Sequence, residues 1–302
     1  MRIAIAALGI LVVAGLVWLF VPFPVTPPVI DETGDAERGA YVLSMGGCTA
    51  CHTDVRNDGP LLAGGPALAT PFGTFYPPNL TPDPATGIGG WTTGEFVQAM
   101  TKGVSPEGYD YYPSFPYTSY ANMTRQDLVD LKAYLDSLEP VDNAVPPHDL
   151  SFPFDIRALL KPWKLMFFHA HGIEPDPSKS ESWNRGNYLV NGPGHCGECH
   201  SPRNALGAVD SARALAGSRV GPDGKPVPNI TPSEDGIGGW SEEDIATGLA
   251  TGLLPEFESF GGAMILVQEN LAHLPRADLD AIAAYLKTLP PRPNGYPKPA
   301  QP

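Results

Sequence analysis

The sequence predicts an all-α protein that contains two copies of one helical domain. Five strings recur in the same order, about 150 residues apart, which indicates an internal duplication. Each copy closes with apolar residues at helical spacing, and neither copy shows the alternating pattern of a half-buried strand. The strings are RGAY at 38–41 and RGNY at 185–188, CTACH at 48–52 and CGECH at 196–200, LAG at 62–64 and 215–217, PNLTPDPATGIGGW at 78–91 and PNITPSEDGIGGW at 228–240, and DLVDLKAYLDSL at 127–138 and DLDAIAAYLKTL at 278–289.

The repeat also divides the chain into segments. We expect a transmembrane anchor at 1–21, a spacer at 22–34, a first domain at 35–140, a linker at 141–181, a second domain at 182–291 and a tail at 292–302. Below, residues 35–140 are called the first repeat and residues 182–291 the second repeat.

The N-terminal segment is the first expected element. Residues 3–21 carry no charge and follow Arg2, and about 20 apolar residues cross a hydrocarbon core as a helix. Arg2 predicts a cytoplasmic N-terminus, and Trp18 lies near the opposite interface. A cleaved signal peptide is the alternative, although no A-x-A pattern ends the apolar run. Either interpretation exports the rest of the chain, and the Pro-rich stretch 22–30 then forms a stiff spacer.

Within each repeat, a short helix is expected to lead into the cysteine motif, and a long Gly/Pro-rich loop follows it. A middle helix begins near Thr92 in the first repeat, where Glu95 completes a capping box. The second repeat has a looser version at Ser241 and Asp244.

The last helix of each repeat is expected to begin near Thr124 or near Pro275. Its apolar residues form one stripe on the helix surface. These residues are Leu128, Leu131, Leu135 and Leu138 in the first repeat, and Leu279, Ile282, Leu286 and Leu289 in the second.

Composition limits the class of protein. The chain has 302 residues, which suggests about two domains, and its 42% hydrophobic content is enough for packed cores. With 19 basic and 33 acidic residues the net charge is −14, so we expect no nucleic-acid partner. The acidic surface suits a partner with a basic face, or simply keeps the protein soluble.

All four cysteines fall in two C-x-x-C-H motifs, formed by Cys48, Cys51 and His52 and by Cys196, Cys199 and His200. This spacing is the signature of c-type haem attachment. The two thiols add to the haem vinyl groups, and the adjoining histidine becomes the proximal iron ligand. A thioredoxin-like site would need a βαβ setting, and zinc would need a fourth Cys or His at a matching place in both repeats. The sequence therefore predicts two covalently bound haem c groups.

With these motifs the chain resembles the class I cytochrome c family. More closely, it looks like the diheme cytochromes c that serve as electron-transfer subunits of periplasmic bacterial dehydrogenases. The resemblance covers nearly all of 35–290 and rests on R-G-x-Y before each C-x-x-C-H, P-N-[LI]-T-P, G-I-G-G-W and the closing D-L-x-x-[LI]-x-A-Y-L helix. It implies two tandem cytochrome c domains with His/Met-ligated iron.

The resemblance also implies partners and a location. A periplasmic dehydrogenase would be the electron donor, and a terminal oxidase or a soluble cytochrome would be the acceptor. The N-terminal helix would hold the protein at the bacterial inner membrane, with both haem domains in the periplasm.

The resemblance places the sixth iron ligand, a methionine, shortly before the last helix of each domain. In the second repeat this position holds Met264, the only methionine of that repeat. The alternative is a core methionine, which is the commoner role of this residue.

The first repeat departs from the family pattern. Related sequences have Met where Phe115 stands in YPSFPY. Met100 aligns with Leu249 and is expected in the core, whereas Met123 aligns with Leu274. Met123 therefore either ligates the iron through a shifted loop or belongs to the core. A third alternative leaves haem 1 with an open or labile sixth position. More remote candidates are Met45, His148, Met166, His169 and His171.

Other recurring residues give weaker signals. Asn79, Asn229, Trp91 and Trp240 are expected to shape loops rather than to contact haem. Arg38 and Arg185 either contact haem propionates or lie on a solvated helix face. The apolar run at 152–172 is expected to pack between the domains rather than on a membrane or a partner.

Electron transfer is the function that these features favour. The sequence shows no catalytic triad and no phosphate-binding glycine loop. The alternative is a diheme peroxidase-like enzyme with an open haem 1 iron and an acid–base side chain on its distal face. A sensory or gas-binding module would also need an open iron. An enzyme with a distal cysteine ligand is excluded because the chain has no fifth cysteine.

Overall fold

The computed structural model describes residues 9, 13–15, 17–21, 25–222, 224–255 and 258–296. The expected anchor at 1–21 falls mostly outside these residues. Among the described residues, no helix is both long and apolar enough to cross a membrane.

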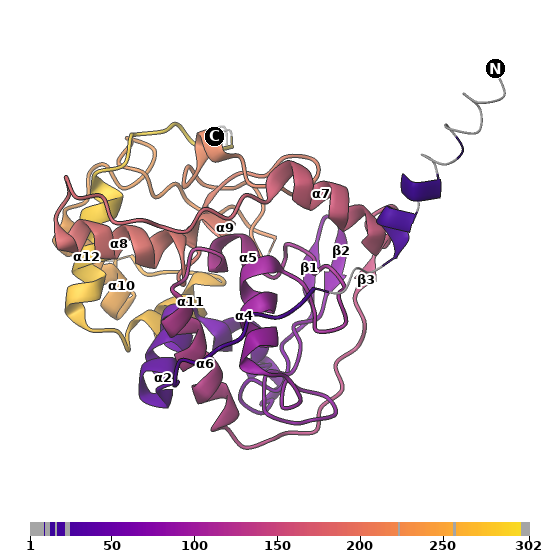
Figure 1. The fold of residues 1–302 in the computed structure, drawn as a ribbon. Coiled ribbons are helices and arrows are strands. Elements are labelled where there is room, and N and C mark those ends of the chain that lie inside the picture. The colour runs from indigo at the N-terminus through magenta and orange to yellow at the C-terminus, as the bar shows by residue number, and fades with distance from the viewer. Residues whose placement is uncertain are drawn as a thin grey trace.

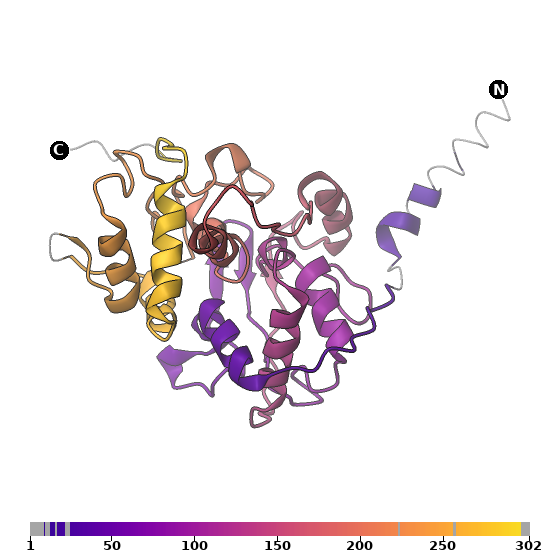
Figure 2. The ribbon, with the colours of Figure 1, turned by 60° about the vertical axis from the view of Figure 1, so that its left-hand side comes forward.

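The fold is helix-rich, with long connections between short helices (Figures 1 and 2). The first repeat contributes α2 (Ala36–Met45), α3 (Cys48–His52), α4 (Thr93–Lys102), α5 (Tyr117–Tyr120) and α6 (Arg125–Asp136). The linker contributes α7 (Leu160–Phe167). The second repeat contributes α8 (Glu181–Asn191), α9 (Cys196–His200), α10 (Glu242–Thr251), α11 (Met264–Leu271) and α12 (Arg276–Lys287). Three-residue 3-10 turns lie at Val55–Asn57, Arg157–Leu159 and Ser211–Arg213.

A small antiparallel sheet corrects the all-α prediction. Strands β1 (Leu68–Thr70) and β2 (Gly73–Phe75) form a tight hairpin, and β3 (Asp149–Leu150) pairs with β2. A strand of three residues is too short to show an alternating pattern, and β3 comes from the distant linker. The prediction missed the sheet because pairing between distant short segments leaves no periodic signal.

The expected helix starts are confirmed. Thr92 caps α4 and Ser241 caps α10, and both form complete capping boxes with Glu95 and Asp244. The last helices α6 and α12 begin directly after Thr124 and Pro275. Of the predicted apolar stripes, Leu128, Leu131, Leu135, Leu279, Ile282 and Leu286 are buried.

A glycine of each R-G-x-Y string lets two helices approach closely. In the first repeat α2 packs on α6, and in the second α8 packs on α12. A Cβ atom on Gly39 would lie 2.0 Å from the carbonyl oxygen of Asp130, and one on Gly186 would lie 2.0 Å from that of Ala281. Because this distance is far below van der Waals contact, only glycine permits the two crossings.

The arginines of the same strings reinforce these crossings. Arg38 Nε donates to Asp130 at 2.8 Å, and Arg185 Nε donates to Asp278 at 2.8 Å. The sequence suggested haem propionates or a solvated helix face for Arg38 and Arg185. It did not indicate that carboxylates of the last helix bind both guanidinium groups.

The two largest hydrophobic clusters of the described residues each belong mainly to one repeat, and Met45 of the first repeat is buried in the cluster of the second. The cluster of the first repeat contains Val42, Leu43, Leu62, Ile88, Phe96, Val97, Met100, Tyr120, Met123, Leu128, Leu131 and Leu135. The other contains Leu189, Val190, Leu215, Ile237, Ile245, Ala246, Leu271, Leu274, Leu279, Ile282, Ala283, Tyr285 and Leu286 of the second repeat, together with Met45 of the first.

Hydrogen bonds between the repeats are reciprocal. Tyr41 donates to Asp278 at 2.7 Å, and Tyr188, its counterpart in the second repeat, donates to Asp127, the counterpart of Asp278. Each repeat thus makes the same tyrosine–aspartate contact with the other, so the interface has approximate two-fold symmetry.

The linker helix α7 contacts both repeats, as expected from the sequence. Trp163 Nε1 donates to the carbonyl oxygen of Leu206 at 2.8 Å, and Lys164 forms an ion pair with Asp110 at 2.6 Å. Lys164 also donates to the carbonyl oxygens of Lys102 and Gly103. The linker therefore fixes the repeats to each other rather than merely connecting them.

The helix crossings give a first prediction. Gly39→Ala and Gly186→Ala should each lower the free energy of unfolding by about 1 to 3 kcal/mol, because the added methyl group meets backbone that cannot move aside. Urea unfolding of the haem-loaded protein measures this change. Gly239→Ala is the control, since a Cβ there meets no atom within 4 Å. Equal stabilities for all three variants would contradict the prediction.

A second prediction concerns acid stability. Burial alone would raise the pKa of Asp278, but hydrogen bonds from Arg185 and Tyr41 lower it below its ordinary value. In the unfolded chain an aspartate has a pKa of about 3.9. Because the pKa of Asp278 is lower in the folded protein, its ionised form stabilises the fold at any pH above the unfolded-state pKa. This stabilisation is lost as the pH falls through the folded-state pKa. Asp278→Asn should therefore flatten the loss of stability below about pH 4.

Unfolding free energies measured across this pH range test the prediction. Asp280→Asn serves as the control, because Asp280 is half exposed and pairs with Arg276 of its own helix. If Asp278→Asn kept the full acid dependence of the parent, the ion-pair explanation would be wrong.

Candidate haem sites

The four cysteines form two matched pairs of thiols. They lie on the five-residue helices α3 and α9, and none is in a disulfide. Cys48 packs against the cluster of the first repeat, and Cys196 packs against that of the second. Each motif thus places two thiols three residues apart on one helical turn, beside an apolar core. This donor set fits covalent haem attachment.

The histidine of each motif is oriented in the same way. The ring Nδ1 lies 2.8 Å from the carbonyl oxygen of Pro78 for His52 and from that of Pro228 for His200. A carbonyl oxygen accepts only, so Nδ1 carries the proton and Nε2 keeps a free lone pair. Burial lowers the pKa of both histidines, which favours the neutral ring that binds a metal. Both imidazoles therefore fit the role of proximal iron ligand.

Asn79 and Asn229 hold the loops that supply these carbonyl groups. Asn79 Oδ1 accepts from the backbone N–H of Thr81 at 2.9 Å, and its Nδ2 donates to Val141 O at 2.7 Å. Asn229 makes equivalent bonds with Thr231 N and Arg292 O, both at 2.8 Å. Since protein groups satisfy both buried amides, the loop-shaping role expected for these asparagines is confirmed.

The predicted methionine ligands lie in the clusters that also contact the attachment cysteines. Met123 is 8% exposed and shares its cluster with Cys48. Met264 begins α11 and packs at the edge of the cluster that Cys196 contacts. Both assignments stay predictions. Met100 is buried, as expected for a core residue.

The remote ligand candidates lie elsewhere. Met45 is buried in the cluster of the second repeat, and Met166 is 53% exposed. His148 accepts from the backbone N–H of Tyr76, and the rings of His169 and His171 stack on the surface. None of the described residues forms a group of three or more His, Cys, Asp or Glu side chains that could hold a metal ion.

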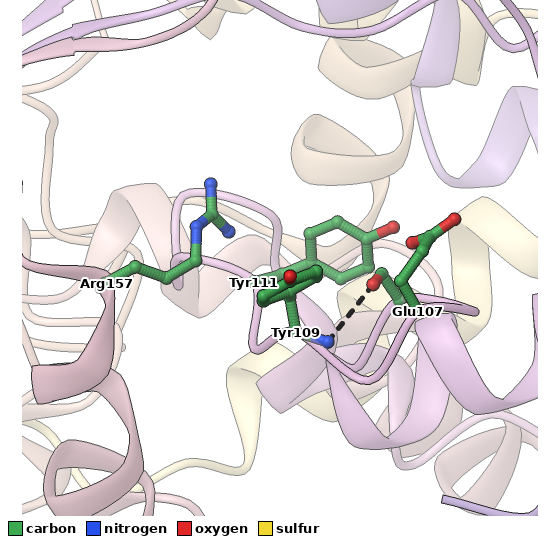
Figure 3. A pocket seen from close by; sticks show the side chains of 5 residues that line it. Glu107, Tyr109, Tyr111 and Arg157 are labelled. Atoms are coloured by element: carbon green, nitrogen blue, oxygen red, sulfur yellow. Dashed lines mark hydrogen bonds between the residues drawn. The ribbon is translucent and has the colours of Figure 1, made fainter. Parts of the chain in front are cut away.

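An open cavity of about 360 Å³ lies apart from these residues (Figure 3). Its lining consists of Ser105, Glu107, Tyr109, Tyr111 and Arg157, and the backbone N–H of Tyr109 donates to Ser105 Oγ at 3.2 Å. No predicted haem ligand lines it, so it adds nothing to the haem sites.

Sequence reasoning missed the residues that join the two attachment segments. His195 Nε2 lies 3.1 Å from the carbonyl oxygen of Gly46, and the His195 ring lies 5.5 Å from that of Tyr120. A comparison of the two repeats could have pointed to these residues. His195 and Glu198 stand where the first repeat has Gly47 and Ala50.

Glu198 is the most strongly bound of these residues. Its carboxylate accepts hydrogen bonds from Thr118 at 2.7 Å, Ser119 at 3.0 Å and Arg203 at 2.5 Å. Burial alone would raise the pKa of Glu198, but Arg203 and the two hydroxyl groups lower it. The carboxylate of Glu198 thus has three side-chain donors, from α5 and from Arg203, within the second attachment motif.

Comparison with known proteins gives the family. A family model described as cytochrome c matches residues 36–139. The chain is 47% identical to a diheme cytochrome c-type protein of Cereibacter sphaeroides, over 94% of this chain and 97% of the relative. It is 43% identical to a nicotinate dehydrogenase component of Pseudomonas putida and 39% identical to the fructose dehydrogenase cytochrome subunit of Gluconobacter japonicus. These matches cover 96% and 87% of this chain, but only 24% and 54% of those two relatives.

Loss of either thiol pair gives a third prediction. Replacing Cys48 and Cys51 with alanine should reduce covalently bound haem from two groups per chain to one, and the same double change at Cys196 and Cys199 should remove the other. Mass spectrometry of the denatured protein counts the retained haem. Ser105→Ala, in the open cavity, is the control and should keep both. Two haems retained in either double variant would contradict the assignment.

Proposed function

The chain belongs to the cytochrome c family, and from this premise we propose that it is a diheme carrier of single electrons from a periplasmic dehydrogenase toward the respiratory chain. One observation carries the proposal. Two C-x-x-C-H helices each place a neutral histidine with a free Nε2 beside two thiols, through the same contact to a proline carbonyl. A general acid or a substrate pocket is not required for this function.

The chain's own residues supply attachment, ligation and shielding. Bound haem c provides an iron that cycles between the ferric and ferrous states. The four cysteines hold the two groups, and His52 and His200 provide the proximal nitrogen ligands. We assign the sixth ligands to Met123 and Met264, because both lie in or against the cluster contacted by the cysteine of the same repeat. Methionine ligation raises the reduction potential and keeps small molecules from the iron.

The interface between the repeats suits transfer within one chain. The contact of His195 with Gly46 joins the short segments that lead into the two attachment helices. The reciprocal bonds of Tyr41 and Tyr188 and the linker contacts of Trp163 fix the repeats further. A fixed separation of the two attachment segments is what a two-site carrier needs.

The donor and the location follow from relatives and from the N-terminal sequence. Relatives are named as cytochrome subunits of alcohol, fructose and gluconate dehydrogenases, and we propose a dehydrogenase as donor here too. A terminal oxidase or a soluble cytochrome would accept the electrons. A net charge of −14 favours partners with basic docking faces.

We further propose that residues 1–21 anchor the protein in the inner membrane, with the repeats in the periplasm. The support is the uncharged run at 3–21 behind Arg2. Lys161 Nζ donates to the carbonyl oxygens of Trp18 at 2.7 Å and Val21 at 2.6 Å, so α7 contacts the end of this segment.

Electron paramagnetic resonance of the oxidised full-length protein gives a fourth prediction. Two low-spin ferric signals are expected, because each iron has six ligands. Met264→Ala should convert only the haem 2 signal to high spin, and Met123→Ala only the haem 1 signal. Met166→Leu, at an exposed site, should change neither.

The spin states distinguish an electron carrier from a peroxidase-like enzyme. Two low-spin signals and two reversible one-electron steps in a redox titration support electron transfer. A high-spin haem 1 in the parent protein would contradict the proposal, and it would favour the peroxidase-like alternative.

A further inference from the structure

The segments that carry the predicted sixth ligands contact the opposite repeat. Helix α5 lies between Phe115 and Met123 of the first repeat, and it contacts α9, the attachment helix of the second (Figure 1). Helix α11 begins at Met264 of the second repeat and packs on α3, the attachment helix of the first. The arrangement is therefore crossed, and it agrees with the two-fold character of the interface.

Glu198 makes the first crossed contact. It is the second variable residue of the CGECH motif, and its side chain is 12% exposed. One carboxylate oxygen accepts from both Thr118 and Ser119 of α5, at 2.7 and 3.0 Å. The other accepts from Arg203 at 2.5 Å, which fixes the carboxylate toward α5. Hydrogen bonds to a carboxylate that is paired with an arginine are charge-assisted, and they are stronger than those between neutral groups.

The same segment is held again next to Met123. Asn122 Nδ2 donates to the carbonyl oxygen of Asn191 in the second repeat at 3.0 Å, and Met123 N donates to Tyr120 O at 3.0 Å. The stretch 118–123 is thus bound to the opposite repeat at both ends. Because both ends are held, Met123 has few alternative positions, and release of either end would add to them.

Thr49 makes the second crossed contact. It is the first variable residue of the CTACH motif, and its hydroxyl group donates to Asn270 Oδ1 at 2.8 Å. Asn270 in turn donates to the carbonyl oxygen of Leu266, so its amide is fixed within α11. Because the helix is rigid, this bond also limits the position of Met264 at the other end of α11.

We propose that the variable residues of each attachment motif position the sixth-ligand segment of the opposite haem: Glu198 acts on haem 1 through α5, and Thr49 acts on haem 2 through α11. The proposal rests on the proposed function and on the assignment of Met123 and Met264 as ligands. Glu198 and Thr49 are positioning residues, because they act through the segments they hold. The consequence is that the ligation of each iron depends on the integrity of the other repeat.

The expected effect follows from the bonds that are removed. Loss of hydrogen bonds to a charged group changes an equilibrium by about tenfold or more. In Glu198→Ala the equilibrium between ligated and open haem 1 should therefore shift toward the open form by about this factor. Because methionine ligation raises the potential, the haem 1 potential should fall as well.

The experiment compares single variants of the full-length haem-loaded protein by electron paramagnetic resonance and redox titration. The signals are assigned to the two haems with Met123→Ala and Met264→Ala. Glu198→Ala should weaken the low-spin signal of haem 1 more than that of haem 2, although Glu198 lies in the haem 2 motif. Thr49→Val should do the reverse and affect mainly haem 2.

Matched variants separate positioning from general destabilisation. Glu243→Ala removes another carboxylate bound to an arginine at 2.5 Å, within the second repeat and exposed to solvent. Thr101→Val removes a hydroxyl group that donates to Val97 O inside α4. Both should leave the two signals unchanged. A double variant, Thr118→Val with Ser119→Ala, removes the donors and keeps Glu198, and it should reproduce the haem 1 effect.

Each outcome decides the proposal. Crossed effects in Glu198→Ala and in the Thr118/Ser119 variant support it. Effects confined to the haem of the altered motif, equal effects on both haems, or no effect overturn it. If the parent protein lacked two covalent haems, the proposed function itself would be refuted. Mass spectrometry of the denatured protein counts the haems and so distinguishes this result from failure of the positioning proposal.

Discussion

The backbone contact at Gly39 and Gly186 is the constraint on which the rest of the structure depends. Each glycine lets the helix before an attachment motif lie directly on the last helix of the same repeat. Gly46 and Gly47 alone separate α2 from α3, so the crossing also sets where the first pair of thiols begins. The arginine beside each glycine binds a carboxylate of the last helix. This directional bond limits rotation of one helix against the other, which close packing alone would not prevent.

Duplication then creates an interface that neither repeat has alone. Tyr41 and Tyr188 occupy equivalent positions and each reaches the last helix of the opposite repeat. The two repeats differ at two positions of this interface. Glu198 and His195 of the second repeat align with Ala50 and Gly47 of the first, which have no polar side chain. The interface therefore treats the two haem sites differently.

The sequence predicted the local features well, because each has a short-range physical cause. The capping residues Thr92 and Ser241, the leucine stripes and the attachment motifs are all determined within a few residues. Contacts between distant residues were missed. Arg38 could not be assigned to Asp130, nor Thr49 to Asn270, because a polar side chain does not encode its partner across the fold. The pairing of β3 with β2 failed for the same reason.

Phe115 is the departure from the family pattern that bears most on function. Its ring lies 5.6 Å from that of Tyr111 and 5.7 Å from that of Tyr120, and it packs against the cluster of the first repeat. A phenyl ring packed in this way fills space as a methionine would, but it has no atom that can bind iron. Met123 lies buried in the same cluster, only a few residues along the chain. If the ligand role has moved to Met123, the α5 segment between the two residues becomes the part of the first repeat that sets ligation, and Glu198 holds this segment.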